Sequence, residues 1–150
     1  MKKLFTRAAT ALAVVLPLQS AQAADKPNIV FVLFDDMGYG QPKCYSEDTQ
    51  LKTPNIDRLA AEGMRFIDAH APGPLCHMSR YGLLTGRYAW RTRLQKGVLD
   101  GSDDPPLIAD GRLTVPEFLR RHGYTTAAIG KWHVGMARKE LKPNSRGVDF

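Results

Sequence analysis

A continuous apolar segment, Asn28 to Phe34, most constrains the fold of this chain. Its β-branched and aromatic residues do not alternate with polar ones, which is typical of a strand that is covered on both faces. Such strands belong to parallel sheets flanked by helices, so we predict a central parallel strand in an α/β fold. Asp35 and Asp36 follow at once, at the carboxyl end of the strand, where open α/β sheets bind ligands.

Segments with helix and strand patterns alternate along the rest of the chain. Residues 53–63 carry an N-cap residue, a proline at the first helical position and a closing glycine, so they predict a helix. A capping box predicts another helix over residues 114–123, and a short helix is expected over 79–84. The segments that predict further strands are residues 64–69 and 124–129. This order indicates a doubly wound, mostly parallel sheet.

The adjacent carboxylates of Asp35 and Asp36 are candidate ligands for a metal ion. Neighbouring residues in a strand point to opposite faces, so both carboxylates reach one ion only where the chain leaves strand geometry. Gly38 and Gly40 allow such a turn. Two hard oxygen ligands favour Ca²⁺ or Mg²⁺ over zinc. The alternative is that one aspartate caps a turn while the other is solvated.

Residues 74–87 place a cysteine, a serine and an arginine within five residues at the start of a helix-compatible run. Unpaired backbone N–H groups at a helix start stabilise an oxyanion. Arg80 adds a planar, charged fork that suits sulfate or phosphate. From the residues alone, three roles stay open for Cys76: a thiolate nucleophile beside His77, half of a disulfide with Cys44, or a buried structural side chain.

Lys131 and His133 follow the last predicted strand, over residues 124–129. They therefore fall at the same ligand-binding edge of the sheet as Asp35 and Asp36. Because side chains alternate with a period of two, Lys131 and His133 share a face if the strand continues that far. An ammonium group and an imidazole at one edge are suited to holding an anion and transferring protons.

Four segments together resemble the type I sulfatases of the alkaline phosphatase superfamily. They are Asp35-Asp36, Thr53 to Gly63, Cys76 to Arg87 with its Cys-x-x-Ser-Arg and Leu-Thr-Gly-Arg, and Gly130 to Gly135. The resemblance implies an alkaline-phosphatase-like α/β fold, with a mixed, mostly parallel sheet flanked by helices. It also implies that residues 24–150 are only the amino-terminal portion of a sulfatase catalytic domain. Because central strands would then have open edges, we expect the 150-residue chain alone to be poorly stable and inactive.

The resemblance further implies the hydrolysis of sulfate esters. Cys76 would be oxidised to formylglycine by a formylglycine-generating maturation enzyme, and the hydrated aldehyde would be the nucleophile. The implied metal is Ca²⁺, with Mg²⁺ less favoured. Its ligands would be Asp35, Asp36 and the modified Cys76. The implied catalytic residues are Cys76, Arg80, Lys131 and His133, of which Arg80, Lys131 and His133 would also bind the substrate.

Two other functions stay open. Phosphate mono- or diester hydrolases of the same superfamily carry a similar cysteine motif. Arg80 would not distinguish a tetrahedral phosphate group from a sulfate group. The second alternative is a non-catalytic exported fragment or pseudoenzyme. Met78 favours that alternative, because the sulfatases usually have proline, and sometimes alanine, two residues after the cysteine.

The first 23 residues have the pattern of an export signal. A basic start precedes an apolar stretch, and the small-x-small sequence that ends at Ala23 marks a cleavage site. We therefore expect a periplasmic or secreted protein, without a stable membrane anchor because the apolar stretch is too short. Three basic residues leave with the signal, so the formal charge falls from +6 to +3. That charge profile argues against binding to nucleic acid.

Overall fold

The computed structural model describes residues 26–99, 104–135 and 142–150. The predicted export signal, residues 1–23, lies outside the described residues. The chain divides into two units, one that ends at Leu33 and one that runs from Phe34 to Phe150. No helix in the described ranges is both long and apolar enough to cross a bilayer.

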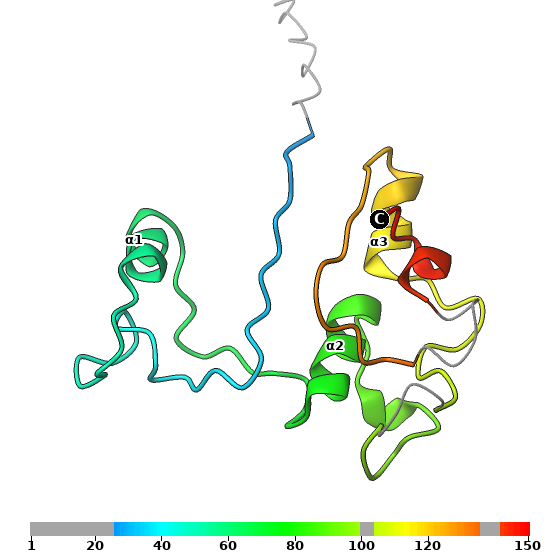
Figure 1. The fold of residues 1–150 in the computed structure, drawn as a ribbon, viewed down its shortest axis with the longest axis horizontal. Coiled ribbons are helices and arrows are strands. Elements are labelled where there is room, and N and C mark those ends of the chain that lie inside the picture. Colours follow the sequence, from blue (N-terminus) through cyan, green and yellow to red (C-terminus); the bar gives the residue numbers. More distant parts are fainter. Residues whose placement is uncertain (1–25, 100–103, 136–141) are drawn as a thin grey trace, which may run out of the picture. The chain divides into compact units, whose positions relative to one another are not determined.

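The described part of the chain contains α-helices and short 3₁₀ helices (Figure 1). They are α1 (Pro54–Glu62), α2 (Cys76–Thr85), η1 (Ala89–Arg91), α3 (Val115–Arg121) and η3 (Pro143–Arg146). In α3 the predicted capping bond is present, since the Glu117 N–H donates to Thr114 Oγ1 at 3.3 Å. In α1 the Thr53 side chain makes no cap, because its hydroxyl accepts from the Lys43 N–H and bonds Asp57 instead.

Helix α2 begins three residues earlier than the sequence predicted. The Leu75 carbonyl accepts from the N–H groups of Met78 and Ser79 at 3.0 and 3.1 Å, which closes a first turn over Cys76. The helix ends at Thr85 and is capped by Gly86, whose left-handed φ of 66° favours glycine and whose N–H donates to the carbonyl of Gly82. The early start places Cys76 in the first turn of a helix.

The predicted strands are not formed within the described residues. Segments 28–34, 64–69 and 124–129 run without strand pairing. Their apolar side chains face solvent, with Val30 87% and Ile129 101% exposed. An apolar pattern makes a segment suited to a sheet, but a strand also requires hydrogen bonds from a neighbouring strand. The sheet is therefore not confirmed in this part of the chain.

The last residues lie alongside residues 126–128 in the sense of a parallel pair. The Asp149 N–H donates to the Thr126 carbonyl, and the Ala128 N–H donates to the Phe150 carbonyl, each at 3.0 Å. The Asp149 carboxylate also accepts from the Thr126 N–H at 2.8 Å. The second backbone bond falls one residue beyond the acceptor that a parallel bridge requires, so no strand results.

A small apolar core connects α2 with the segments that follow it. Its buried side chains are Tyr81, Ala89, Leu107, Ile108 and Val134. The Leu107 N–H donates to the Val134 carbonyl at 3.1 Å, so the loop before α3 lies against the segment that carries Lys131 and His133. The core therefore fixes α2 relative to that segment, and with it the candidate site.

Candidate active site

The loop that precedes Cys76 lies directly on α2. A β-carbon added to Gly82 would lie 2.4 Å from Pro72 Cγ, so the loop approaches the helix more closely than any side chain there would allow. The Ser79 hydroxyl donates to the Gly73 carbonyl at 3.2 Å and ties the same loop to the first turn of α2. These two contacts hold the backbone that leads into Cys76.

Cys76 and His133 are in contact although 57 residues separate them. Cys76 Sγ lies 3.1 Å from His133 Nδ1, and His133 Nε2 lies 2.9 Å from the Leu99 carbonyl oxygen. Because a carbonyl only accepts, we assign the hydrogen to Nε2, which leaves Nδ1 of the neutral ring as an acceptor. His133 is therefore oriented to take a proton from position 76. Its left-handed φ of 52° is strained for a residue with a β-carbon.

Asp35 forms ion pairs with two cations. Its Oδ2 lies 2.8 Å from Lys131 Nζ and 3.4 Å from an Arg80 guanidinium nitrogen. Arg80 also donates to the Lys131 carbonyl. The hydrogen bond from Lys131, followed by the charges of both cations, lowers the pKa of Asp35, and the bond to Asp35 raises the pKa of Lys131. The Asp35 carboxylate and the Lys131 ammonium group are therefore charged at neutral pH, and Lys131 and Arg80 both approach one oxygen atom of Asp35.

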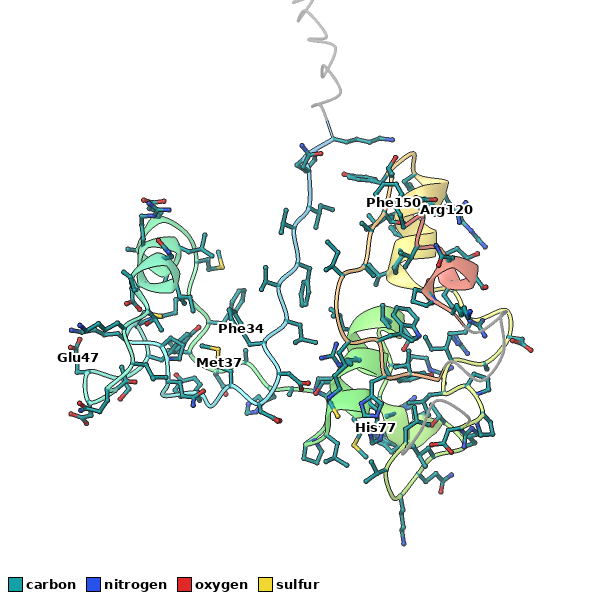
Figure 2. The ribbon with its side chains drawn as sticks, viewed as in Figure 1. Phe34, Met37, Glu47, His77, Arg120 and Phe150 are labelled. Carbon is teal, nitrogen blue, oxygen red and sulfur yellow. The ribbon has the colours of Figure 1, made fainter. Side chains whose placement is uncertain are left out.

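His77, labelled in Figure 2, lies on α2 and is completely buried. Its ring meets the His133 ring edge to face, with 5.9 Å between centroids. Neither ring nitrogen has a hydrogen-bond partner among the described residues. Burial is the main cause that lowers the pKa of His77, so its ring is neutral at neutral pH. The Cys76 thiol is thus paired with His133 and not with His77.

The carboxylates of Asp35 and Asp36 are the type of ligand that a hard cation prefers, but two of them are too few to hold it. Asp36 has a left-handed φ of 59°, which takes the chain out of the extended geometry that would send the two side chains to opposite faces. Ca²⁺ takes about six to eight oxygen ligands. In the described ranges, no group of three or more histidine, cysteine or acidic side chains could hold a metal ion. Asp35, Asp36 and Cys76 are therefore not arranged as a three-ligand group here, and together they would supply only part of a coordination shell.

The structure brings most of the predicted site residues together. The cluster consists of Asp35, Arg80 and Lys131, with Cys76 and His133 beside it. Asp36 forms no ion pair with a described residue. Cys44 and Cys76 are both free thiols, so the disulfide between them is not formed. The backbone N–H of Cys44 donates to the carboxylate of Asp57 on α1 at 2.9 Å.

Sequence reasoning did not identify two groups beside this cluster. The Leu99 carbonyl sets the tautomer of His133, but a backbone carbonyl leaves no signal in residue type, so no pattern could have revealed it. The burial of His77 against His133 was also missed. A histidine next to a candidate nucleophile is a visible signal, but its contact with His133 depends on how distant segments pack.

The sequence matches known proteins over most of its length. A family model described as Sulfatase matches residues 27–150. An N-acetylgalactosamine-6-O-sulfatase of Bacteroides thetaiotaomicron is 37% identical over 139 residues, which are 87% of this chain and 26% of that protein. Human arylsulfatase A is 45% identical over 113 residues, which are 75% of this chain and 22% of that protein.

The structure also resembles solved structures. The crystal structure of Ps i-CgsB matches with a TM-score of 0.69 and 35% identity, over 77% of this chain and 25% of that one. The same protein in complex with k-i-k-neocarrahexaose matches with a TM-score of 0.69 and 34% identity, over the same shares of both chains. This chain therefore spans about a quarter of the length of the proteins that it matches.

Proposed function

Because this chain belongs to the sulfatase family, we propose that residues 24–150 form the amino-terminal part of a catalytic domain that hydrolyses sulfate esters. Family membership brings with it the alkaline-phosphatase-like α/β fold. We further propose that segments 28–34 and 124–129 are strands of a mostly parallel sheet in the whole enzyme. The activity is proposed for that whole protein, since this chain spans about a quarter of its relatives.

The contact between Cys76 Sγ and His133 Nδ1, at 3.1 Å, is the observation that supports this proposal most directly. It joins a candidate nucleophile to a candidate proton acceptor from a distant part of the sequence. Arg80, about one turn along α2, and Lys131, two residues before His133, are the cations that flank this contact. A nucleophilic position, a base and two cations are the groups that transfer of a sulfate group requires.

The Asp35 carboxylate shows what the two cations are able to hold. Lys131 and Arg80 both approach its Oδ2, so their donors already converge on one anionic oxygen. In the proposed enzyme the same donors would bind oxygens of the sulfate group and neutralise the charge that develops during the reaction. His133 would orient a hydroxyl at position 76 and take its proton.

Two groups besides the unmodified side chains take part in the proposed chemistry. Formylglycine made from Cys76 would supply, once hydrated, a hydroxyl nucleophile for attack on sulfur. Asp35, Asp36 and position 76 would hold Ca²⁺, with Mg²⁺ less favoured, and the ion would polarise the sulfate group as a Lewis acid.

Maturation and export form a further part of the proposal. We propose that residues 1–23 direct export, with cleavage near Ala23, and that a formylglycine-generating enzyme converts Cys76. Met78 follows two residues after Cys76 and packs closely against Gly73, where a β-carbon would lie 2.6 Å from Met78 Cβ. This methionine, in the place of the usual proline, is the observation that favours the non-catalytic alternative.

Turnover of an aryl sulfate and an aryl phosphate by the whole protein tests the function. We expect faster turnover of the sulfate, and a loss of at least about 10³-fold in Cys76→Ala, because that variant lacks the nucleophile. Cys44→Ala removes the other free cysteine and should keep full activity. A mass spectrum of the peptide that contains residue 76 should show an aldehyde in place of the thiol.

Each alternative has its own result in this experiment. Faster turnover of the aryl phosphate would assign the protein to the phosphate hydrolases. An unmodified thiol at position 76 together with no turnover of either ester would support the non-catalytic protein.

A further inference from the structure

A pocket of about 310 Å³ lies beyond the carboxyl end of α2. Its lining includes Arg87, Arg91, Arg93 and Arg112, together with Tyr81 and Thr92. We call it the arginine pocket. No carboxylate is among the described residues that line it. Its volume is at the lower end of the range for small-molecule sites, about 300–1,000 Å³.

Two of these arginines are held by groups that carry no negative charge. Arg93 donates to the carbonyls of Pro105 and Pro106, the second at 3.3 Å. The Arg91 guanidinium lies over the Trp90 ring, 4.8 Å from its centroid. A carbonyl or an aromatic face satisfies or orients a guanidinium without neutralising it. The positions of these side chains are therefore defined while their charge remains.

The acids of the described residues are paired elsewhere or absent from the pocket. None of the ion pairs in this part of the chain involves an arginine of the pocket. Asp110, which follows the pocket residue Ala109, bonds Arg146 at 3.1 Å. Arg146 also donates to the carbonyls of Ile108 and Ala109, so this pairing is anchored to the backbone. Within the described residues, no carboxylate therefore compensates the four positive charges of the arginine pocket.

The field of α2 does not cancel these charges. A helix carries a partial charge of roughly −0.5 at its carboxyl end, which by itself disfavours an anion there. Four guanidinium groups outweigh that partial charge several-fold. An oxyanion in the pocket would also relieve the repulsion between neighbouring arginines, and guanidinium groups bind tetrahedral oxyanions with paired hydrogen bonds.

The arginine pocket is separate from the candidate active site. Cys76 is the first residue of α2, whereas Arg87 lies two residues beyond its last residue. A helix of ten residues is about 15 Å long, so one sulfate group cannot reach both ends.

We propose that the arginine pocket is a second oxyanion site, which binds a sulfate group apart from the one at position 76. That group is either free sulfate or a further sulfate group on a substrate with several of them. Binding of free sulfate does not depend on the proposed function, whereas the substrate-borne case rests on it.

Calorimetric titration of the whole protein with inorganic sulfate, against chloride at equal ionic strength, tests the site. The variant Arg87→Gln/Arg112→Gln should bind sulfate at the pocket at least about tenfold more weakly, because charge-assisted hydrogen bonds are lost. Lys52→Gln/Arg58→Gln removes the same charge from exposed residues at and before α1 and is the matched control. It should leave sulfate binding unchanged.

A milder variant keeps the test decisive if the double variant unfolds. Arg91 is exposed, so Arg91→Gln should retain the fold and weaken sulfate binding by about threefold. An equal weakening in the control variant would overturn the proposal, because only net charge would then matter. Absence of any sulfate site other than the active site in the unsubstituted protein would also overturn it.

The two sources of the sulfate group differ in a kinetic measurement. If the group belongs to the substrate, Arg91→Gln raises the KM of a disulfated aryl ester but leaves that of a monosulfated ester unchanged. If free sulfate is the ligand, both KM values stay the same while calorimetric binding weakens. A protein without turnover would contradict the proposed function, yet the calorimetric test of the pocket would still stand.

Discussion

The two ends of α2 hold positive charge in different ways. At the end with Cys76, Arg80 and Lys131 are paired with Asp35. At the other end, the arginine pocket has no carboxylate in its described lining. Cations that are paired with a carboxylate are held beside an opposite charge, whereas cations that are held by neutral groups keep their full charge for an anion from outside. Charge balance, more than the number of cations, therefore distinguishes a reaction site from a binding pocket.

Among the variants that test this comparison, the largest effect is expected from removing the Asp35 carboxylate, which pairs with the cations near Cys76. Asp35→Asn removes the charge that holds Lys131 and Arg80, together with a proposed metal ligand, so kcat/KM for an aryl sulfate should fall by about 100-fold or more. Asp48→Asn, at an exposed loop position, is the control and should have full activity. Sulfate affinity of the arginine pocket should not change. A loss at both ends of α2 would show that the two sites are coupled.

A smaller effect is expected from the contact that holds the loop before Cys76. Gly82→Ala places a β-carbon 2.4 Å from Pro72 Cγ, and overpacking of this kind costs about 1–3 kcal/mol. Alanine gains roughly 0.8–1.0 kcal/mol over glycine inside a helix, so we expect a net loss of about 1 kcal/mol in the free energy of unfolding. Denaturant titration measures this loss.

Gly40→Ala is the matched control for that variant. Its β-carbon would meet the nearest side chain, Ser46, at 3.5 Å, an ordinary contact, so the free energy of unfolding should stay nearly constant. Equal effects of the two substitutions would mean that the loop does not depend on its close approach to α2.

Local signals in the sequence predicted the helices well, whereas the predicted sheet is not confirmed in the described residues. The capping bond between Thr114 and Glu117 involves residues three apart, so the sequence alone contains it. A strand such as residues 28–34 needs a partner from elsewhere in the chain, and its pattern does not say which. Thr126 and Asp149 come nearest to such a pairing among the described residues.

The same distinction applies to the candidate site. The motifs identified Cys76, Lys131 and His133 as candidate catalytic residues. They did not indicate that the Leu99 carbonyl would fix the tautomer of His133. The arginine pocket did have a sequence signal, since residues 81–99 contain several basic residues and no acid. That Arg112 joins them depends on packing, which composition does not reveal.

The smallest expected effect tests whether any nearby carboxylate neutralises the positive charge of the arginine pocket. Asp110 is exposed and pairs with the buried Arg146, so Asp110→Asn should lower the free energy of unfolding by less than about 1 kcal/mol. Since this carboxylate is directed to Arg146, the sulfate affinity of the arginine pocket should also stay constant. Tighter sulfate binding in Asp110→Asn would show that Asp110 already neutralises part of the pocket. The contrast between a balanced and an unbalanced end of α2 would then be one of degree.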